Sequence, residues 1–402
     1  MTKLEELIQE LCPNGVKYLT IPELFITRNG YTPSKANAEF WGNGTIPWFR
    51  MEDIRENGRI LTKSTQYVSE KAIKGKLFPE DSIIIATSAT IGEHALIKVP
   101  SLANQRFTYL VLKDEFKSSV DMMFIFYYCF KLDEFCKTHL NQGNFASVDM
   151  KQFAEFKFPL PPLPVQREIV RILDNFTELT AELQAELQAR KEQYEYYRNK
   201  LLMFDKIGGD TQSVTWLKMS EIGTFIRGKR FVRTDIVSNG VPCIHYGDMY
   251  TYYGLYATQS KGRLRSELAS KMRYAQKNDV VIVAAGENKE DIGVGLAWLG
   301  DEPAAVHDAC FIFRSDLYPQ YVSHYLRSNY YHKQIVKYVS EGKICSISAK
   351  GLGNAIIPIP AHEEQVRIAT LLNNFDALVG DLTKGIPAEM VAVQEQYEYY
   401  RN

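Results

Sequence analysis

The chain has 402 residues, of which 45% are hydrophobic and 24% are charged, and its formal net charge is −1. This length predicts two or more domains, and the near-zero charge excludes a protein that is basic over its whole surface. The six cysteines form no C-x-x-C pair, which argues against a zinc ribbon or a disulfide framework, and the N-terminal segment lacks the apolar core of a signal peptide.

The first lobe, predicted over residues 1–158, has a mixed α/β pattern. Apolar runs rich in β-branched residues predict strands at Ser82–Ala86 and Phe107–Leu112. Asn-Gly pairs predict tight turns between the strands of this lobe. A helix is predicted over Val120–Lys137, shortly before a Pro-x-Pro segment.

Residues 159–207 are predicted to form a long helix. No Gly or Pro interrupts the sequence between Pro164 and Gly208, so the helix would be about 58 Å long. Apolar side chains recur in steps of four and three residues, which is the spacing of a coiled-coil seam. The first seam comprises Ile172, Phe176, Leu179 and Leu183.

The second lobe, predicted over residues 208–356, repeats this order of elements. Strands are predicted at Val280–Ala284 and Ala309–Phe313, and a helix over Gln320–Tyr338. A second helical region, residues 357–402, follows, with a seam at Leu371, Phe375, Leu378 and Leu382. Proline removes a helical hydrogen bond, so Gly385–Pro387 predicts a break, with the helix resuming at Ala388. The two seams favour packing against each other; the alternative is two separate helices, each packed on its own lobe.

An internal repeat relates the two halves of the chain. The segment 159–176 recurs 199 residues later, so that Gln166 corresponds to Gln365. The sequence Gln193–Asn199 recurs unchanged as Gln396–Asn402, with four extra residues in the second copy. The lobes share fainter similarities: the Ile46-Pro47 pair with Asp53 matches Val241-Pro242 with Asp248. The closely similar helices indicate a shared scaffold, and the dissimilar lobes indicate different targets.

Local basic patches interleaved with tyrosines favour nucleic-acid binding. Residues 227–277 hold ten Lys or Arg against three Asp or Glu, although a solvated charged face could have the same composition. Polar side chains in the loops flanking the strands are the candidates for base contact. In the first lobe they are Arg28, Arg50, Asn104, Gln105, Asn141 and Asn144, and in the second Arg227, Arg230, His245, Tyr246, Tyr250 and Arg263.

Three segments suggest enzyme chemistry only weakly. Asp279 with Glu287 and Lys289 has the residue types of a metal-dependent nuclease, which is the rival hypothesis for the whole chain. The segment Gly223–Arg230 nearly matches a P-loop, but arginine stands where a hydroxyl must reach magnesium. His307-Asp308 with Cys310 could form a ligand or nucleophile cluster, but a polar turn that enters a strand explains it better. We therefore predict no catalytic and no metal-binding residues.

The chain resembles the specificity subunit of Type I restriction–modification systems over nearly its whole length. The resemblance rests on motifs that occur in the same order: Leu11–Val16, Ile46–Asp53, Ile91-Gly92, the segment 159–176 and the repeated Gln193–Arg198. It implies two target-recognition domains that each read one half of a bipartite, asymmetric DNA sequence. It also implies that the two long helices pack as an antiparallel coiled coil.

The resemblance further implies a non-catalytic, cytoplasmic protein of a bacterium or archaeon. Such a subunit would recruit methyltransferase subunits and, through them, restriction and translocase subunits. S-adenosylmethionine, ATP and Mg²⁺ would then be bound by those partners and not by this chain. The Gly385–Pro387 break departs from the family pattern of a continuous helix.

Overall fold

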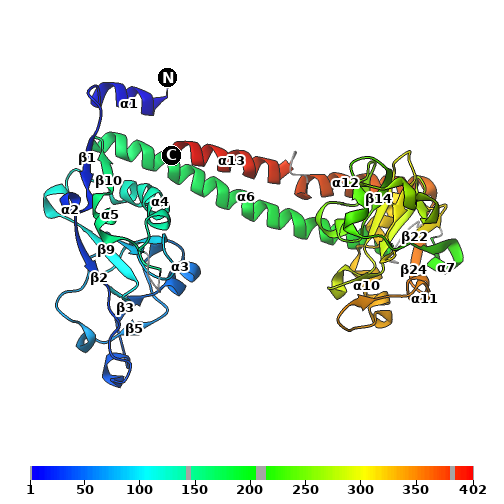
Figure 1. Ribbon diagram of the computed structural model, residues 1–402, viewed down its shortest axis with the longest axis horizontal. Coiled ribbons are helices and arrows are strands. Elements are labelled where there is room, and N and C mark those ends of the chain that lie inside the picture. Colours follow the sequence, from blue (N-terminus) through cyan, green and yellow to red (C-terminus); the bar gives the residue numbers. More distant parts are fainter. Residues whose placement is uncertain (1, 142–145, 205–213, 381–384, 402) are drawn as a thin grey trace. The chain divides into compact units, whose positions relative to one another are not determined.

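Figure 1 shows the computed structural model, which describes residues 2–141, 146–204, 214–380 and 385–401. The chain forms two compact units. Unit 1 comprises residues 1–182 and 391–402, and unit 2 comprises residues 183–390. Each unit thus contains one mixed α/β lobe together with parts of the long helices, and the two are described separately.

Unit 1 holds the N-terminal lobe and the start of a helix of 41 residues, α6. Its helices are α1 (Lys3–Leu11), α2 (Ile21–Leu24), α3 (Met51–Asn57), α4 (Met122–Thr138), α5 (Met150–Glu155), the first part of α6 (Leu163–Met203) and the last part of α13 (Gly385–Arg401). Its strands are β1 (Lys17–Thr20), β2 (Phe25–Asn29), β3 (Ile46–Phe49), β4 (Ile60–Leu61), β5 (Tyr67–Val68), β6 (Ser82–Ala86), β7 (His94–Ile97), β8 (Leu102–Ala103), β9 (Phe107–Leu112) and β10 (Lys157–Leu160).

Unit 2 holds the second lobe and the remainder of α6. Its strands are β11 (Thr215–Lys218), β12 (Gly223–Arg227), β13 (Ile236–Val237), β14 (Val241–Ile244), β15 (Tyr256–Ala257), β16 (Gly262–Leu264), β17 (Tyr274–Ala275), β18 (Val280–Val283), β19 (Ala285–Gly286), β20 (Gly295–Trp298), β21 (Ala304–Val306), β22 (Cys310–Ser315), β23 (Cys345–Ser346) and β24 (Ile356–Ile359). Its helices are α7 (Met219–Ile222), α8 (Asp248–Thr251), α9 (Pro319–Tyr325), α10 (Asn329–Ile335), α11 (Ala349–Gly353), α12 (His362–Gly380) and the start of α13 (Gly385–Arg401).

The main sheets of the two lobes have the same strand order. The order is β2-β9-β6-β7-β4 in unit 1 and β12-β22-β18-β20-β15 in unit 2. The four predicted strands are confirmed as β6, β9, β18 and β22, and the structure places all of them inside the sheets. Every residue of β6 is buried, because its β-branched run Ile83–Ile85 packs on both faces of the sheet.

A second sheet in each lobe contains a pair of neighbouring parallel strands. In unit 1, β3 pairs with β8 through Trp48↔Leu102 and Phe49↔Ala103. In unit 2, β14 pairs with β21 through Cys243↔Ala305 and Ile244↔Val306. Parallel neighbours end at the same edge of a sheet, so the residues that follow the two strands of each pair come together.

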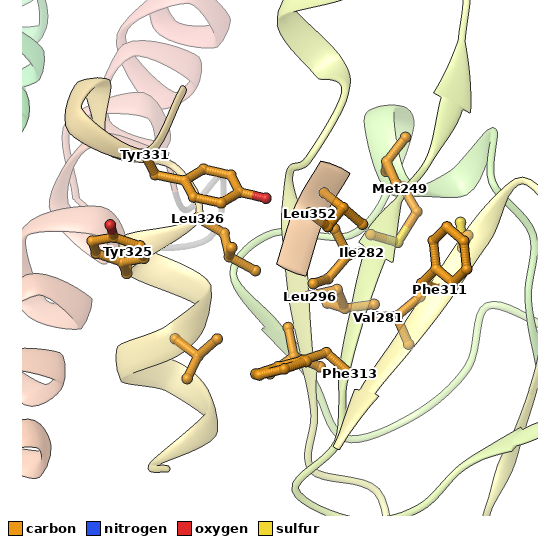
Figure 2. Packing of buried hydrophobic residues seen from close by; sticks show 14 of the residues in the cluster. Met249, Val281, Ile282, Leu296, Phe311, Phe313, Tyr325, Leu326, Tyr331 and Leu352 are labelled. Carbon is orange, nitrogen blue, oxygen red and sulfur yellow. The ribbon is translucent and has the colours of Figure 1, made fainter. Parts of the chain in front are cut away.

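The first and last strands of each lobe pair with one another, β1 with β10 and β11 with β24. Each last strand leads directly into a long helix, so the helix begins beside the strand pair that joins the start and the end of its lobe. Figure 2 shows the core of unit 2, where Tyr325, Leu326 and Tyr331 from the α9–α10 region belong to the same buried cluster as Phe313 of the main sheet. Burial of each such side chain contributes about 1.5–3 kcal/mol.

The long helices pair within each unit. In unit 1, Phe176 of α6 stacks on Tyr400 of α13, with ring centroids 5.7 Å apart. In unit 2, Tyr197 of α6 stacks on Phe375 of α12 at 5.6 Å. Earlier in α6, Leu187 lies with Val379 around one groove. Because lower residue numbers on α6 meet higher ones on α12, this pair is antiparallel.

The predicted seam agrees only in part with burial. Leu183 is buried, and Ile172, Phe176, Phe375 and Leu378 are half-buried. Leu179 and Leu371 are exposed, to 37% and 38%, whereas Leu372 is fully buried. Each helix must cover its own lobe as well as its partner helix, and this second contact displaces the apolar stripe. Leu382 lies outside the described residues.

Two predicted helices differ from the structure. Instead of one helix over Gln320–Tyr338, α9 ends at Tyr325 and α10 begins at Asn329, because Ser328 forms an N-cap with its hydroxyl accepting from the Tyr331 N–H. The predicted break at Gly385–Pro387 is wrong in its position, because these three residues form the first turn of α13, which begins at Gly385 and not at Ala388. Pro387 is tolerated because the first turn of a helix has no internal acceptor for its N–H.

Candidate nucleic-acid interface

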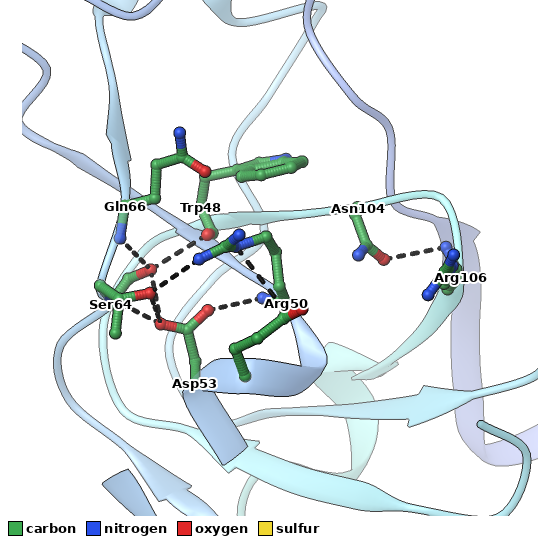
Figure 3. A network of polar contacts seen from close by, with 9 residues as sticks. Trp48, Arg50, Asp53, Ser64, Gln66, Asn104 and Arg106 are labelled. Atoms are coloured by element: carbon green, nitrogen blue, oxygen red, sulfur yellow. Dashed lines mark hydrogen bonds and ion pairs between the residues drawn. The ribbon is translucent and has the colours of Figure 1, made fainter. Parts of the chain in front are cut away.

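In unit 1, two of the predicted contact residues meet where the parallel strands end. Arg50 follows β3 and Asn104 follows β8 (Figure 3). The Asn104 N–H donates to the carbonyl of Phe49 at 3.0 Å, which continues the strand pairing by one residue. The backbone of Gly30 lies against this edge. A Cβ atom there would be 2.3 Å from the Asn104 carbonyl oxygen, so only glycine fits.

A buried aspartate holds the Arg50 segment in place. One Asp53 carboxylate oxygen accepts from the Arg50 N–H at 2.7 Å. The other accepts from the N–H of Thr65 at 2.6 Å, from its hydroxyl at 2.9 Å and from the Ser64 hydroxyl at 3.1 Å. Asp53 therefore joins the start of α3 to the loop before β5, which explains the Ile-Pro-x5-Asp pattern in the sequence.

Arg50 and Asn104 keep donors available at this edge. The Arg50 Nη2 donates to the Thr65 hydroxyl at 3.1 Å, and its Nε is buried, 3.9 Å from the Glu52 carboxylate, so the outer end of the guanidinium is the part that can meet a base. The Asn104 side-chain oxygen accepts from the Arg106 N–H at 3.0 Å, which leaves its NH₂ group as the outward donor. Gln105, which is exposed, accepts from the Thr32 hydroxyl.

Unit 2 has the same edge with different side chains. His245 and Tyr246 follow β14, and His307 follows β21. The His307 N–H donates to the Ile244 carbonyl at 3.2 Å, as Asn104 does in unit 1. A side chain at Gly228 would lie 2.2 Å from the His307 carbonyl oxygen, so this glycine matches Gly30.

Three rings lie together at this second edge, with their planes tilted relative to one another. The ring centroids lie 4.7 Å apart for His245 and Tyr246, 5.0 Å for Tyr246 and His307, and 4.8 Å for the two imidazoles. Tyr246 is 36% exposed and both imidazoles are buried. Burial lowers the pKa of both imidazoles, and the Asp308 carboxylate only partly offsets this for His307. Both rings are therefore neutral at neutral pH.

Cations surround the three rings. Arg227 is exposed, and its Nε donates to the Asp308 carbonyl at 3.0 Å. Lys229 and Arg230 are exposed and have no side-chain ion pair within the described part of the chain. Arg233 lies 4.0 Å from the Asp248 carboxylate. This arrangement suits a polyanion, because the rings offer flat apolar faces between positive charges.

The other predicted contact residues have structural partners. Arg28 donates to the Lys76 carbonyl at 2.8 Å and lies 4.2 Å above the Phe78 ring. Asn141 donates to the Val148 carbonyl, and Arg263 bonds the Gly240 carbonyl and Glu302. Tyr250 of α8 is 38% exposed, and a side chain at Gly286 would lie 2.6 Å from its hydroxyl. Asn144 lies outside the described residues.

The sequence pattern did not reveal His307 as an edge residue and indicated only a polar turn. The turn is real, since the His307 carbonyl accepts from the Cys310 N–H at 3.0 Å. Its place beside His245 depends on the parallel pairing of β14 with β21, which is long-range in sequence. The spacing of Asp53 and Asp248 after a Val/Ile-Pro pair was the one local signal of this edge.

The residues that suggested enzyme chemistry are engaged in structural contacts. Both oxygens of Asp279 accept from Arg314, at 2.9 and 2.7 Å, and Lys289 pairs with Glu341, so the nuclease arrangement does not form. Cys310 is fully buried, which raises the pKa of its thiol to about 12. The segment Gly223–Arg227 is a strand, not a phosphate-binding loop.

The described residues contain neither a metal-binding cluster nor a membrane-spanning helix. Among residues 2–141, 146–204, 214–380 and 385–401, no group of three or more His, Cys, Asp or Glu could hold a metal ion. Within those same ranges, no helix is long and apolar enough to cross a membrane.

Known structures share this fold at low sequence identity. A chain from a study of complex assembly and conformational transition of a type I restriction–modification system aligns with a TM-score of 0.67, 17% identity and 97% coverage of both chains. The HsdS subunit from Thermoanaerobacter tengcongensis aligns with a TM-score of 0.54 and 16% identity, covering 96% of this chain and 97% of that one.

Sequence relatives identify the family. The EcoprrI specificity subunit of Escherichia coli is 38% identical over 392 residues, covering 92% of this chain and 90% of its own. The EcoR124I/EcoR124II specificity subunit of the same species is 32% identical and covers 65% of this chain and 67% of its own. The family described as the Type I restriction modification DNA specificity domain matches residues 13–191 and 213–391. The chain therefore belongs to the specificity subunits of Type I restriction–modification systems.

Proposed function

We propose that each unit reads one half of the DNA target with the edge at which the parallel strands of its second sheet end, β3 and β8 in unit 1 and β14 and β21 in unit 2. Family membership makes the chain the DNA-recognising, non-catalytic subunit that works with methyltransferase and restriction subunits. The observation that carries the proposal is the equivalence of the two edges. They share their backbone hydrogen bond and their glycine, yet they present different side chains.

The unit 1 edge suits hydrogen bonding to bases. A guanidinium such as that of Arg50 can bond guanine O6 and N7, and the Asn104 amide supplies a further donor. Asp53 fixes the backbone at Arg50, which limits the entropy lost when the guanidinium engages a base. Gln105 extends the same edge.

The unit 2 edge suits stacking and contact with phosphates. Tyr246 presents an exposed ring seated on two neutral imidazoles, while Lys229 and Arg230 provide cations without protein partners in the described residues. His245 accepts from the Gly247 N–H through Nδ1 at 3.2 Å, so its neutral ring carries the proton on Nε2. This edge therefore offers one imidazole N–H as a donor to a base.

We further propose that S-adenosylmethionine, ATP and Mg²⁺ bind to the partner subunits and that the complex works in the cytoplasm. Methylation and translocation chemistry need acid–base and phosphate-binding groups, and the candidate groups Asp279 and Lys289 are held in structural ion pairs. The six cysteines are free and buried, which suits a reducing compartment.

The test is substitution of Arg50 by alanine in the complex with the methyltransferase subunit. Mapping of methylated adenines in the source genome supplies the target sequence. We expect affinity for the target duplex to fall by roughly 5- to 150-fold, the equivalent of about 1–3 kcal/mol for one bidentate base contact. Affinity for a duplex whose unit 1 half-site is scrambled should change little.

Arg55→Ala is the matched control, because Arg55 is exposed on the neighbouring helix α3. We expect it to leave the ratio between target and scrambled duplex unchanged. If Arg50→Ala weakened both duplexes by the same factor, Arg50 would contact only the DNA backbone, and base reading at this edge would be wrong.

A further inference from the structure

A buried glutamine joins lobe to helix in both units. The Gln166 side chain accepts from the Asp121 N–H and donates to the carbonyls of Ser119 and Pro161. Gln365 accepts from the Tyr318 N–H and donates to the Pro360 carbonyl, both at 2.9 Å. These bonds fix where each helix leaves its lobe, and buried side chains such as Leu173 and Leu372 add apolar contacts between helix and lobe core. Apolar contacts are not directional, so further hydrogen bonds are needed to hold helix and lobe at one angle.

A second contact between lobe and helix differs between the units. In unit 1 the Tyr127 hydroxyl of α4 donates to Asp174 of α6 at 2.6 Å. In unit 2 the corresponding contact is made by an imidazole: His324 of α9 bonds Asn373 of α12 through Nε2 at 2.9 Å. Asp174 and Asn373 occupy the same position of the repeat.

Besides Asn373, His324 also contacts α6, a connection for which Tyr127 has no counterpart. Its Nδ1 lies 3.3 Å from the hydroxyl of Tyr194, which belongs to α6. The Nε2 proton is donated to the Asn373 oxygen and Nδ1 accepts from the tyrosine, so a neutral ring satisfies both bonds. His324 is fully buried and thereby links the lobe helix α9 to both long helices of unit 2.

We infer that His324 is a positioning residue that holds the lobe of unit 2 at a fixed angle to α6 and α12 and so determines how strictly the gap between the two half-sites is measured. The inference rests on the DNA-recognition function and the bipartite target proposed above, but not on which edge residues contact bases. One base pair displaces a half-site by about 3.4 Å along the DNA axis, so a loosened joint would tolerate a wrong gap.

The groups around His324 predict that acid breaks this joint, by which we mean the hydrogen bonds from His324 to Asn373 and Tyr194. Arg198 of α6 and Arg327, which follows α9, oppose a charged imidazole, whereas the hydrogen bond to Asn373 favours it. Tyr194, His332 and Asp376 of α12, which interacts with both arginines and with Tyr194, complete the titratable surroundings. Burial dominates, and it lowers the pKa of His324 to about 4. A ring released from the joint would regain an ordinary pKa near 6.5, so protons favour the open joint as the pH falls from 6.5 towards 4.

The experiment measures gap selectivity in the complex with the methyltransferase subunit. The probes are duplexes with the mapped half-sites and a gap of native length or one base pair longer or shorter. We expect His324→Phe, which removes both hydrogen bonds, to lower the preference for the native gap by roughly fivefold to thirtyfold, with unchanged half-site preference. His324→Gln, which can both donate and accept, should retain most of it.

Controls separate positioning from general damage. Tyr194→Phe removes one hydroxyl without loss of packing and should give a smaller loss of gap preference, which covers the case in which His324→Phe fails to fold. His332→Gln changes another histidine of unit 2 outside the bridge and should change nothing. Lowering the pH from 7.5 to 5.5 should reduce gap preference in the wild type but not in His324→Gln.

Two results would overturn the inference. Equal weakening at every gap length by His324→Phe and Tyr194→Phe would show that the bridge only stabilises unit 2. Altered half-site preference would show that it acts through the DNA-contacting edge. If Arg50→Ala has no effect on DNA while gap preference still depends on His324, the edge assignment fails and the positioning role stands.

Discussion

Units 1 and 2 place different chemistry at equivalent positions. In unit 1 the residue after the first parallel strand is Arg50, held by an aspartate that accepts from neutral donors. In unit 2 the same place holds His245 within a cluster of tilted rings, and Asp248, the counterpart of Asp53, pairs with the ammonium group of Lys261 at 3.0 Å. The backbone of the edge has been kept while its side chains and their supports have changed.

The difference shows which parts of a duplicated recognition unit can vary. The shared glycines and the backbone bond between strand ends fix where side chains are presented, and the side chains themselves follow the target. The hydrogen bonds between lobe and helix differ as well: Tyr127 bonds Asp174 in unit 1, and His324 bonds Asn373 in unit 2. All four histidines whose pKa is lowered by burial, His245, His307, His324 and His332, lie in unit 2.

The largest effect is expected from removing the buried glutamines. Gln166→Ala leaves three main-chain groups of unit 1 without a partner and should lower the free energy of unfolding by roughly 3–6 kcal/mol, at about 1–2 kcal/mol for each buried group. Gln365→Ala leaves two and should cost roughly 2–4 kcal/mol in unit 2. Urea unfolding of both variants measures the difference.

Gln188→Ala is the control for these variants, because Gln188 lies exposed on α6 and bonds only Glu192. It should leave both unfolding transitions in place. A larger loss for Gln365→Ala than for Gln166→Ala would contradict the comparison, since it would mean that bond number does not govern the strength of the joint.

A smaller loss of stability is expected when either of the two corresponding aspartates, Asp53 or Asp248, is replaced by alanine. Asp53→Ala removes the acceptor of four hydrogen bonds and should destabilise unit 1 by roughly 2–3 kcal/mol. Asp248→Ala should cost only about 1 kcal/mol, because its partner Lys261 is 42% exposed and can turn to water. Thermal unfolding tests the order of the two, and equal losses would show that both aspartates serve the same structural role.

The sequence predicted the repeat, four of the strands and the paired helices, because each of these is visible in the spacing of residues along the chain. The β-branched run of β6 and the apolar steps along α6 can be read without knowing what they contact. The edge residues could be predicted only in part, since Arg50 and Asn104 meet through a strand pairing that joins distant segments. The split between α9 and α10 depends on the N-cap Ser328 alone. A single serine within a long apolar run does not by itself predict the end of a helix.

The two units should lose stability at different pH values, because different groups titrate in each. Unit 2 buries His324 neutral with a pKa of about 4, so it loses stability as the pH falls from 6.5 towards 4, by about 2 kcal/mol at pH 5. Asp376 opposes this slightly, because burial raises its pKa. In unit 1, Arg171 lowers the pKa of Glu168 to about 2, so that contribution is lost only below pH 4.5.

Tryptophan fluorescence can follow each unit separately, since Trp48 is buried in unit 1 and Trp298 in unit 2. A variant in which Trp41 and Trp48 are replaced by phenylalanine reports unit 2, and one with Trp216 and Trp298 replaced reports unit 1. We expect the unit 2 signal to change first during acid titration. Coincident transitions, or a lasting difference after His324→Gln, would mean that His324 is not the cause.

The smallest effect concerns cations at the unit 2 edge. Arg230 is exposed without an ion pair in the described residues, so it is free to neutralise a phosphate. Arg230→Ala should weaken binding a few-fold for target and non-target duplexes alike and reduce the slope of log affinity against log salt by about 1. Lys277→Ala is the control, because Lys277 already pairs with Asp301 at 2.7 Å, and its salt slope should stay unchanged. A loss confined to the target duplex would instead make Arg230 a base reader, and unit 2 would then resemble unit 1 in reading DNA through an arginine.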